Sequence, residues 1–124
     1  MNSEALKQMV VENIDENVAM LGDMISLYEH EKKTELENLF VAKPKVVKEV
    51  ALNVLVVYTL LSYREDEIEL KNAQNALSKV CEKEPLAKEL VAVYLQTITI
   101  EDINPNLKKP EIKNKKLVQI LTSF

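Results

Sequence analysis

Residues 44–63 form the most apolar tract of the 124-residue chain and constrain the fold more than any other feature. Pro44 is suited to the first position of a helix, where its missing N–H is not needed. The β-branched residues of the tract also suit a buried strand, but the tract is longer than a typical strand and no turn interrupts it. A helix that is apolar nearly all round is covered by other elements, so the tract predicts a central helix. Its apolar positions are Val46, Val47, Val50, Ala51, Val54, Leu55, Val57, Tyr58, Leu60 and Leu61.

Residues 3–28 predict a long amphipathic helix, because their apolar residues recur every three or four positions. Ser3 is suited to cap the N-terminus of this helix. Gly22, the single glycine of the chain, lies inside the pattern, where it allows either a close approach of another helix or a slight bend. The apolar stripe consists of Leu6, Val10, Ile14, Val18, Leu21, Ile25 and Tyr28.

Charged residues at positions 29–35 interrupt the apolar stripe and leave two alternatives. In the first, the helix continues as an exposed turn to about Val41. In the second, Thr34 caps a short second helix and Glu37, three residues later, completes a capping box. We favour the second alternative, with a break between two helices.

The remainder of the chain predicts further helices separated by short connections. Asp66 can cap a helix that runs to about Lys83, and Pro85 opens another helix. The alternating β-branched residues 97–100 predict either a short extended segment or the end of that helix. Residues 102–109 contain Asn-Pro-Asn and indicate a loop, after which Pro110 opens a final helix.

The sequence therefore predicts an all-α fold, a compact bundle of five or six helices around the central helix at about 44–63. A chain of 124 residues fits a single domain. We assign residues 1–124 to one helical domain that ends in a basic C-terminal segment at 104–124. Short connections favour antiparallel neighbours in such a bundle.

The scarcity of Cys, His and Gly excludes many kinds of site. Cys81 and His30 are the only residues of their types, so the chain cannot supply the four ligands of a structural zinc site. One glycine is too few for a phosphate-binding loop or a dinucleotide-binding turn, and no G-x-S-x-G motif is present. We therefore expect a protein that is not an enzyme and binds neither a cofactor nor a metal.

No segment of the sequence predicts a membrane span. The most apolar run, residues 50–61, contains Asn53 and Thr59 and is much shorter than the roughly 20 residues that a transmembrane helix needs. The first residues have no basic region followed by an apolar stretch, as a signal peptide would have. We expect a soluble, cytoplasmic protein.

The net charge of −4 is unevenly distributed along the chain. Residues 1–40 carry three lysines against nine acidic residues, whereas residues 104–124 carry five lysines against one glutamate. An acidic body is therefore joined to a basic C-terminal segment. Charge runs are usually solvated surface. We interpret this segment as a solvated helix face that docks on the acidic body of the same chain. Its lysines are Lys108, Lys109, Lys113, Lys115 and Lys116.

The single histidine, the single cysteine and the acidic clusters do not indicate a catalytic site. His30 lies between two glutamates near a helix end, where the helix dipole favours its charged form. Cys81 falls on the apolar side of its helix, so we expect a buried, unreactive thiol. We interpret the acidic side chains of the first helix and those at 65–69 as solvated surface and as helix-start residues, respectively.

The first helix offers the best sign of a second surface to bury. Met20 and Leu21, with Val11 and Ala19, widen its apolar stripe beyond one narrow seam. The methionines suit adaptable contacts with a partner, although core packing is the favoured interpretation of Met9, Met20 and Met24. We therefore expect a non-enzymatic protein–protein interaction module, a small helical subunit or adaptor in a homo-oligomer or larger complex. The candidate partner-facing residues are Met9, Val11, Met20 and Met24.

The alternative function is an accessory small subunit of a nucleic-acid-processing complex that contacts nucleic acid through the C-terminal lysines. Small helical subunits of such machines, including those of CRISPR effector complexes, resemble this chain in general architecture, although no motif identifies the family. Five lysines can neutralise a few phosphates. The segment lacks the arginines of bidentate recognition and has no aromatic residue apart from Phe124, so we expect such binding to be weak.

Overall fold

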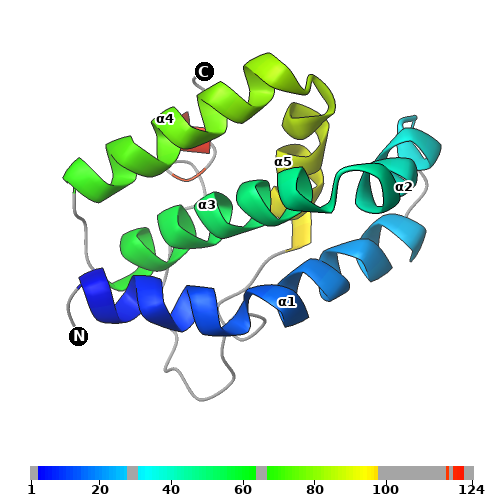
Figure 1. The fold of residues 1–124 in the computed structure, drawn as a ribbon. Helices are drawn as coiled ribbons and strands as arrows, with labels where there is room; N and C mark the ends of the chain where they lie inside the picture. Colours follow the sequence, from blue (N-terminus) through cyan, green and yellow to red (C-terminus); the bar gives the residue numbers. More distant parts are fainter. Residues whose placement is uncertain (1–2, 28–30, 64–66, 98–116, 118, 122–124) are drawn as a thin grey trace.

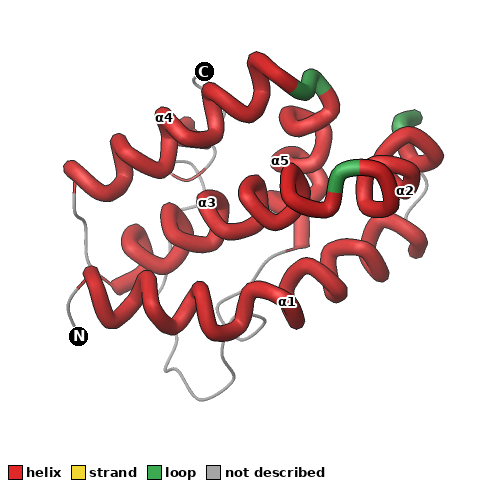
Figure 2. The backbone as a smooth tube through the Cα atoms, in the orientation of Figure 1, coloured by secondary structure: helices red, strands yellow, loops and turns green. Residues whose placement is uncertain are grey.

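The computed structural model describes residues 3–27, 31–63, 67–97, 117 and 119–121, and this part of the chain is all-α, with no strand. Figure 1 shows how the helices are arranged, and Figure 2 shows how short the described connections between them are. The helices are α1 (Ser3–Leu27), α2 (Lys33–Ala42), α3 (Pro44–Tyr63), α4 (Glu67–Lys83) and α5 (Leu86–Thr97).

Helix α3 is the centre of the bundle, as its sequence predicts. It contacts each of the other four helices, with α1 and α4 on either side and α5 crossing behind it (Figure 1). Every residue from 54 to 60 is buried. Helices that flank a common neighbour bury its apolar surface from several directions, which is why α3 is apolar nearly all round.

The predicted break after the first helix is confirmed, but the predicted capping box is wrong. Helix α2 begins at Lys33, with Lys32 as its N-cap residue and no side-chain capping hydrogen bond. The Leu36 N–H donates to the Lys32 carbonyl oxygen at 2.9 Å, so the first helical bond starts from Lys32. Thr34 is therefore already inside the helix, where its hydroxyl cannot take the N-cap position.

The start of α5 also differs from the prediction, by one residue. The helix begins at Leu86, and Pro85 precedes it. Glu84 accepts hydrogen bonds from the first N–H groups of α5. Its carbonyl oxygen accepts the Ala87 N–H at 3.0 Å, and its carboxylate accepts the Leu86 N–H at 3.4 Å. Four sequence predictions lie outside the described residues, namely the Asp66 cap, the extended segment beyond Thr97, the loop at 102–109 and the helix start at Pro110.

Gly22 marks a close approach between α1 and α2. A Cβ atom placed on Gly22 would lie 3.4 Å from Cε1 of the Phe40 ring. The glycine therefore leaves room for an aromatic ring directly over α1. Of the two roles the sequence allows for Gly22, the structure supports close approach.

The C-terminal end of the chain contributes to the same core. Leu117 and Leu121 are 3% and 1% exposed and belong to the cluster of buried apolar residues that α1 to α5 form. Within the 104–124 segment, Leu117 and Leu121 therefore pack on the helical body.

An ion pair joins two corners of the bundle that lie far apart in sequence. Lys43, between α2 and α3, places its Nζ 2.7 Å from Oε2 of Glu84, between α4 and α5. The hydrogen bond donated by Lys43 is the main cause that lowers the pKa of Glu84, aided by the Leu86 N–H and opposed by desolvation. The pair links these two corners of the bundle.

We predict that Lys43→Met raises the pKa of Glu84 towards its ordinary value, measured by NMR titration of the side-chain carboxyl carbon. Because the folded-state pKa of Glu84 lies below its unfolded value, its contribution to stability is present above the unfolded pKa. That contribution is lost as the pH falls through the folded pKa. Lys45→Met removes the same charge nearby and should leave the pKa of Glu84 unchanged; an equal shift in both variants would contradict the specific bond.

We also predict that Leu55→Ala lowers the free energy of unfolding by about 2–5 kcal/mol, because Leu55 is fully buried in α3 and its truncation leaves a cavity. Val41→Ala serves as the control, since Val41 is 85% exposed, and should change stability by no more than about 0.5 kcal/mol. Urea denaturation followed by circular dichroism measures both. Similar losses in the two variants would show that α3 is not the centre of the core.

Candidate interaction groove

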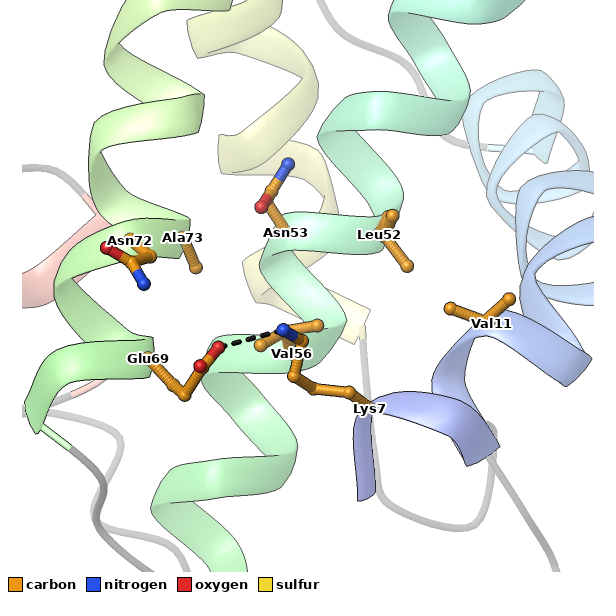
Figure 3. A pocket seen from close by; sticks show the side chains of 8 residues that line it. All are labelled: Lys7, Val11, Leu52, Asn53, Val56, Glu69, Asn72 and Ala73. Atoms are coloured by element: carbon orange, nitrogen blue, oxygen red, sulfur yellow. Dashed lines mark ion pairs between the residues drawn. The ribbon is translucent and has the colours of Figure 1, made fainter. Parts of the chain in front are cut away.

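A groove lies along the outer face of α3, between α1 and α4 (Figure 3). Helices α1 and α4 each pack extensively against α3, and in the described part of the chain they contact one another much less. They therefore leave one strip of α3 only partly covered. The groove is lined by Lys7, Val11, Leu52, Asn53, Val56, Glu69, Asn72 and Ala73.

The helical repeat explains why these residues meet. Leu52 and Val56 are one turn apart on α3, as are Lys7 and Val11 on α1, so each pair faces the same side of its helix. Val56 is buried at the bottom of the groove, Leu52 is half-buried, and Val11 is 49% exposed at the rim. The result is a narrow apolar strip that solvent reaches.

Two ion pairs bound this strip. Lys7 Nζ lies 2.9 Å from Glu69 Oε2 and links α1 to α4 across the face of α3 that carries Val56 (Figure 3). One turn before Leu52, Lys48 Nζ lies 3.5 Å from Asp15 Oδ1. Two turns of α3 separate Lys48 from Val56, which corresponds to about 12 Å. Such partly exposed pairs contribute at most about 1 kcal/mol each. The Lys7–Glu69 pair belongs to the lining of the groove, whereas Lys48 and Asp15 lie outside it.

Two side-chain amides give the groove its polar groups. The Asn53 Nδ2 donates to the Glu49 carbonyl oxygen at 2.9 Å, which holds the side chain in place. Asn72 is exposed on the opposite wall, on α4. An amide both donates and accepts hydrogen bonds, so the groove can recognise uncharged polar groups beside its apolar strip.

The size and chemistry of the groove favour side chains over a larger ligand. Its cavity of about 230 Å³ is smaller than the roughly 300–1,000 Å³ of typical small-molecule sites. Its lining contains no histidine, cysteine or hydroxyl group that could act as a nucleophile. Among the described residues, no group of three or more His, Cys, Asp or Glu side chains could hold a metal ion.

The structure separates the four candidate partner-facing residues of the first helix. Val11 lines the groove, and Met20 and Met24 are partly buried. Met9 is 9% exposed and packs in the core, so for Met9 core packing applies and the partner-surface alternative does not. The reason is its register: Met9 lies beside Val10 on the buried side of α1, whereas Val11 lies at the rim.

The other sequence candidates contribute no chemistry to the groove apart from one ion pair. Glu12, Asp15, Glu16 and Asp23 are exposed on α1, as expected. Glu69 is the exception among the acidic residues at the start of α4, because it pairs with Lys7. His30 and the five C-terminal lysines, Lys108, Lys109, Lys113, Lys115 and Lys116, lie outside the described residues.

Sequence reasoning missed the floor of the groove. Leu52, Asn53 and Val56 all belong to the central tract, which the sequence presents as apolar nearly all round. A signal was available: Lys48, Glu49 and Asn53 place polar groups on one stripe of that helix. A polar stripe on a central helix indicates a face that its neighbours leave uncovered.

Cys81 is buried on α4, and desolvation raises the pKa of its thiol, with a smaller opposing effect from the charge of Lys88. A thiol with a raised pKa carries little of the nucleophilic thiolate. The prediction of a buried cysteine is confirmed.

None of the helices in the described ranges has both the length and the apolar character required to cross a bilayer.

No protein-family model, no curated protein and no solved structure matches this chain. The class that the structure itself defines is an all-α helical bundle with an open groove on its central helix.

We predict that Cys81 of the folded chain reacts with iodoacetamide more slowly than Cys81 of the chain in concentrated urea at the same pH. The reason is that burial both shields the sulfur and disfavours the thiolate. The pH at which the rate reaches half its maximum should be higher in the folded chain. Equal rates and equal pH profiles would contradict the burial of Cys81.

Proposed function

We propose that this protein is a non-enzymatic protein–protein interaction module, a small helical subunit or adaptor whose α1–α3–α4 groove receives a helix of a partner. The observation that carries the proposal is the uncovered strip of α3. Leu52 is half-buried, and beside it Val11 remains 49% exposed although it lies on a helix that packs on the core.

The dimensions of the groove suit two turns of a helix. Amphipathic helices bind in grooves through apolar side chains at positions i, i+3 or i+4, and i+7, which span about the same length as the strip between the two ion pairs. The apolar side chains would cover Leu52 and Val56. Asn53 and Asn72 would favour polar, uncharged neighbours, because a buried amide without a hydrogen bond is costly.

Val11→Lys tests the proposal by placing a charge at the rim of the groove. Ile68→Lys is the matched control, because Ile68 is 74% exposed on α4 and does not line the groove. Tagged wild-type protein and both variants are purified from their source cells after nuclease treatment. We expect a protein partner at stoichiometric level with the wild type and with Ile68→Lys, and its loss with Val11→Lys. Circular dichroism checks that the variants fold.

Light scattering on the purified wild type distinguishes the two kinds of partner. Self-association that Val11→Lys abolishes identifies a second copy as the partner. Retention of the same partner by Val11→Lys would overturn the assignment of the groove, and a monomer that captures no protein would overturn the proposed function itself.

A further inference from the structure

A second concave surface lies between α1 and α2 and shares no residue with the groove. Its cavity, of about 250 Å³, is lined by residues of both helices. Its apolar part is formed by Ile25, which is fully buried, and by the half-buried ring of Phe40. The lining consists of Gly22, Asp23, Ile25, Ser26, Glu37 and Phe40; we call it the α1–α2 pocket.

Gly22 explains why an aromatic wall is present in this pocket. The Phe40 ring lies 3.4 Å from the position that a Cβ atom of residue 22 would occupy. A longer side chain at that position would displace the ring or fill the pocket. The glycine therefore leaves Phe40 as a wall that packs on α1 on one side and remains partly open on the other.

Each helix contributes one carboxylate to the pocket. Asp23 follows Gly22 on α1, and Glu37 precedes Phe40 by one turn on α2. Both side chains are exposed, and neither forms an ion pair with another described residue. The pocket thus combines an aromatic surface with two negative charges on different helices.

The two helices that form the pocket each carry a net negative charge. Helix α1 carries one lysine against five acidic residues, and α2 carries one lysine against two. In contrast, α3 carries two lysines against one glutamate, and α4 and α5 are each neutral. The negative charge of the described helices is therefore concentrated on the α1–α2 hairpin. A surface of one sign attracts partners of the opposite sign and repels nucleic acid.

We propose that the α1–α2 hairpin is a docking surface for a basic polypeptide and that the α1–α2 pocket receives an arginine side chain of that partner. A guanidinium group is planar, stacks on aromatic rings and donates several hydrogen bonds to carboxylates. Phe40 provides the ring, and Asp23 and Glu37 provide the acceptors.

An NMR titration of the full-length, ¹⁵N-labelled chain tests the proposal. The probe is the blocked tripeptide acetyl-Ala-Arg-Ala-amide, and the control is the same peptide with citrulline, which keeps the shape of arginine but is uncharged. We expect the arginine peptide to shift the amide signals of Gly22, Asp23, Ser26 and Phe40 in a saturable manner. The citrulline peptide should leave them in place.

Two double variants locate the binding. In Asp23→Asn/Glu37→Gln the affinity for the arginine peptide should fall by about tenfold or more, because charge-assisted hydrogen bonds are lost. Glu12→Gln/Glu16→Gln removes the same number of charges from exposed positions of α1 outside the pocket and should change the affinity by less than about twofold. All four positions are exposed, so both variants should fold like the wild type.

Three results would overturn the proposal. Shifts spread evenly along α1 would show unspecific attraction to its charge, and equal binding by the two double variants would show that the pocket is not the site. Equal binding of the matching lysine peptide would contradict the assignment to arginine. None of these results depends on Val11, so this test of the α1–α2 pocket is independent of the test of the groove.

Discussion

Burial of α3 is the constraint on which the rest of the structure depends. Leu55 and its neighbours from 54 to 60 are all buried, and each buried aliphatic side chain contributes about 1.5–3 kcal/mol to the hydrophobic driving force. No single helix can cover such a surface. Helices α1, α4 and α5 must therefore pack around one axis, with α2 closing the end near Pro44. The cluster of buried apolar residues shared by these helices is built around this one helix.

The same packing produces the groove. Two helices that flank α3 leave a strip between them, and the Lys7–Glu69 ion pair bridges that strip without filling it. Val11 is exposed and Leu52 is half-buried along this strip. The hairpin of α1 and α2 differs in character, because Gly22 brings the helices close while Asp23 and Glu37 keep its outer side acidic. A helical bundle of this size can thus present two chemically distinct surfaces.

The core also contains polar atoms that its apolar packing does not explain. Asn17 and Thr59 are 1% and 0% exposed, and Oδ1 of Asn17 and Oγ1 of Thr59 have no hydrogen-bond partner among the residues that the structure describes. The Asn17 Nδ2 donates to the Asn13 carbonyl oxygen at 2.9 Å, and the Tyr94 hydroxyl lies 3.5 Å from the Asn17 carbonyl oxygen. This last contact links α1 to α5. Unsatisfied buried polar atoms are costly, so these positions lower the stability of an otherwise apolar core.

The sequence by itself determined the all-α class, the bounds of α3, the break before α2 and the burial of Cys81. These features follow from hydrophobic periodicity and proline placement, which are local signals defined by a few neighbouring residues. It did not determine which side of each helix stays open. Met9 and Val11 are two residues apart and equally apolar, yet one is in the core and the other at the rim of the groove. Only the tertiary structure decided this, since exposure depends on how α1, α3 and α4 cross. For the same reason, the contact between Phe40 and Gly22 and the ion pair between Lys7 and Glu69 could not be predicted from the sequence, because both depend on how the helices pack.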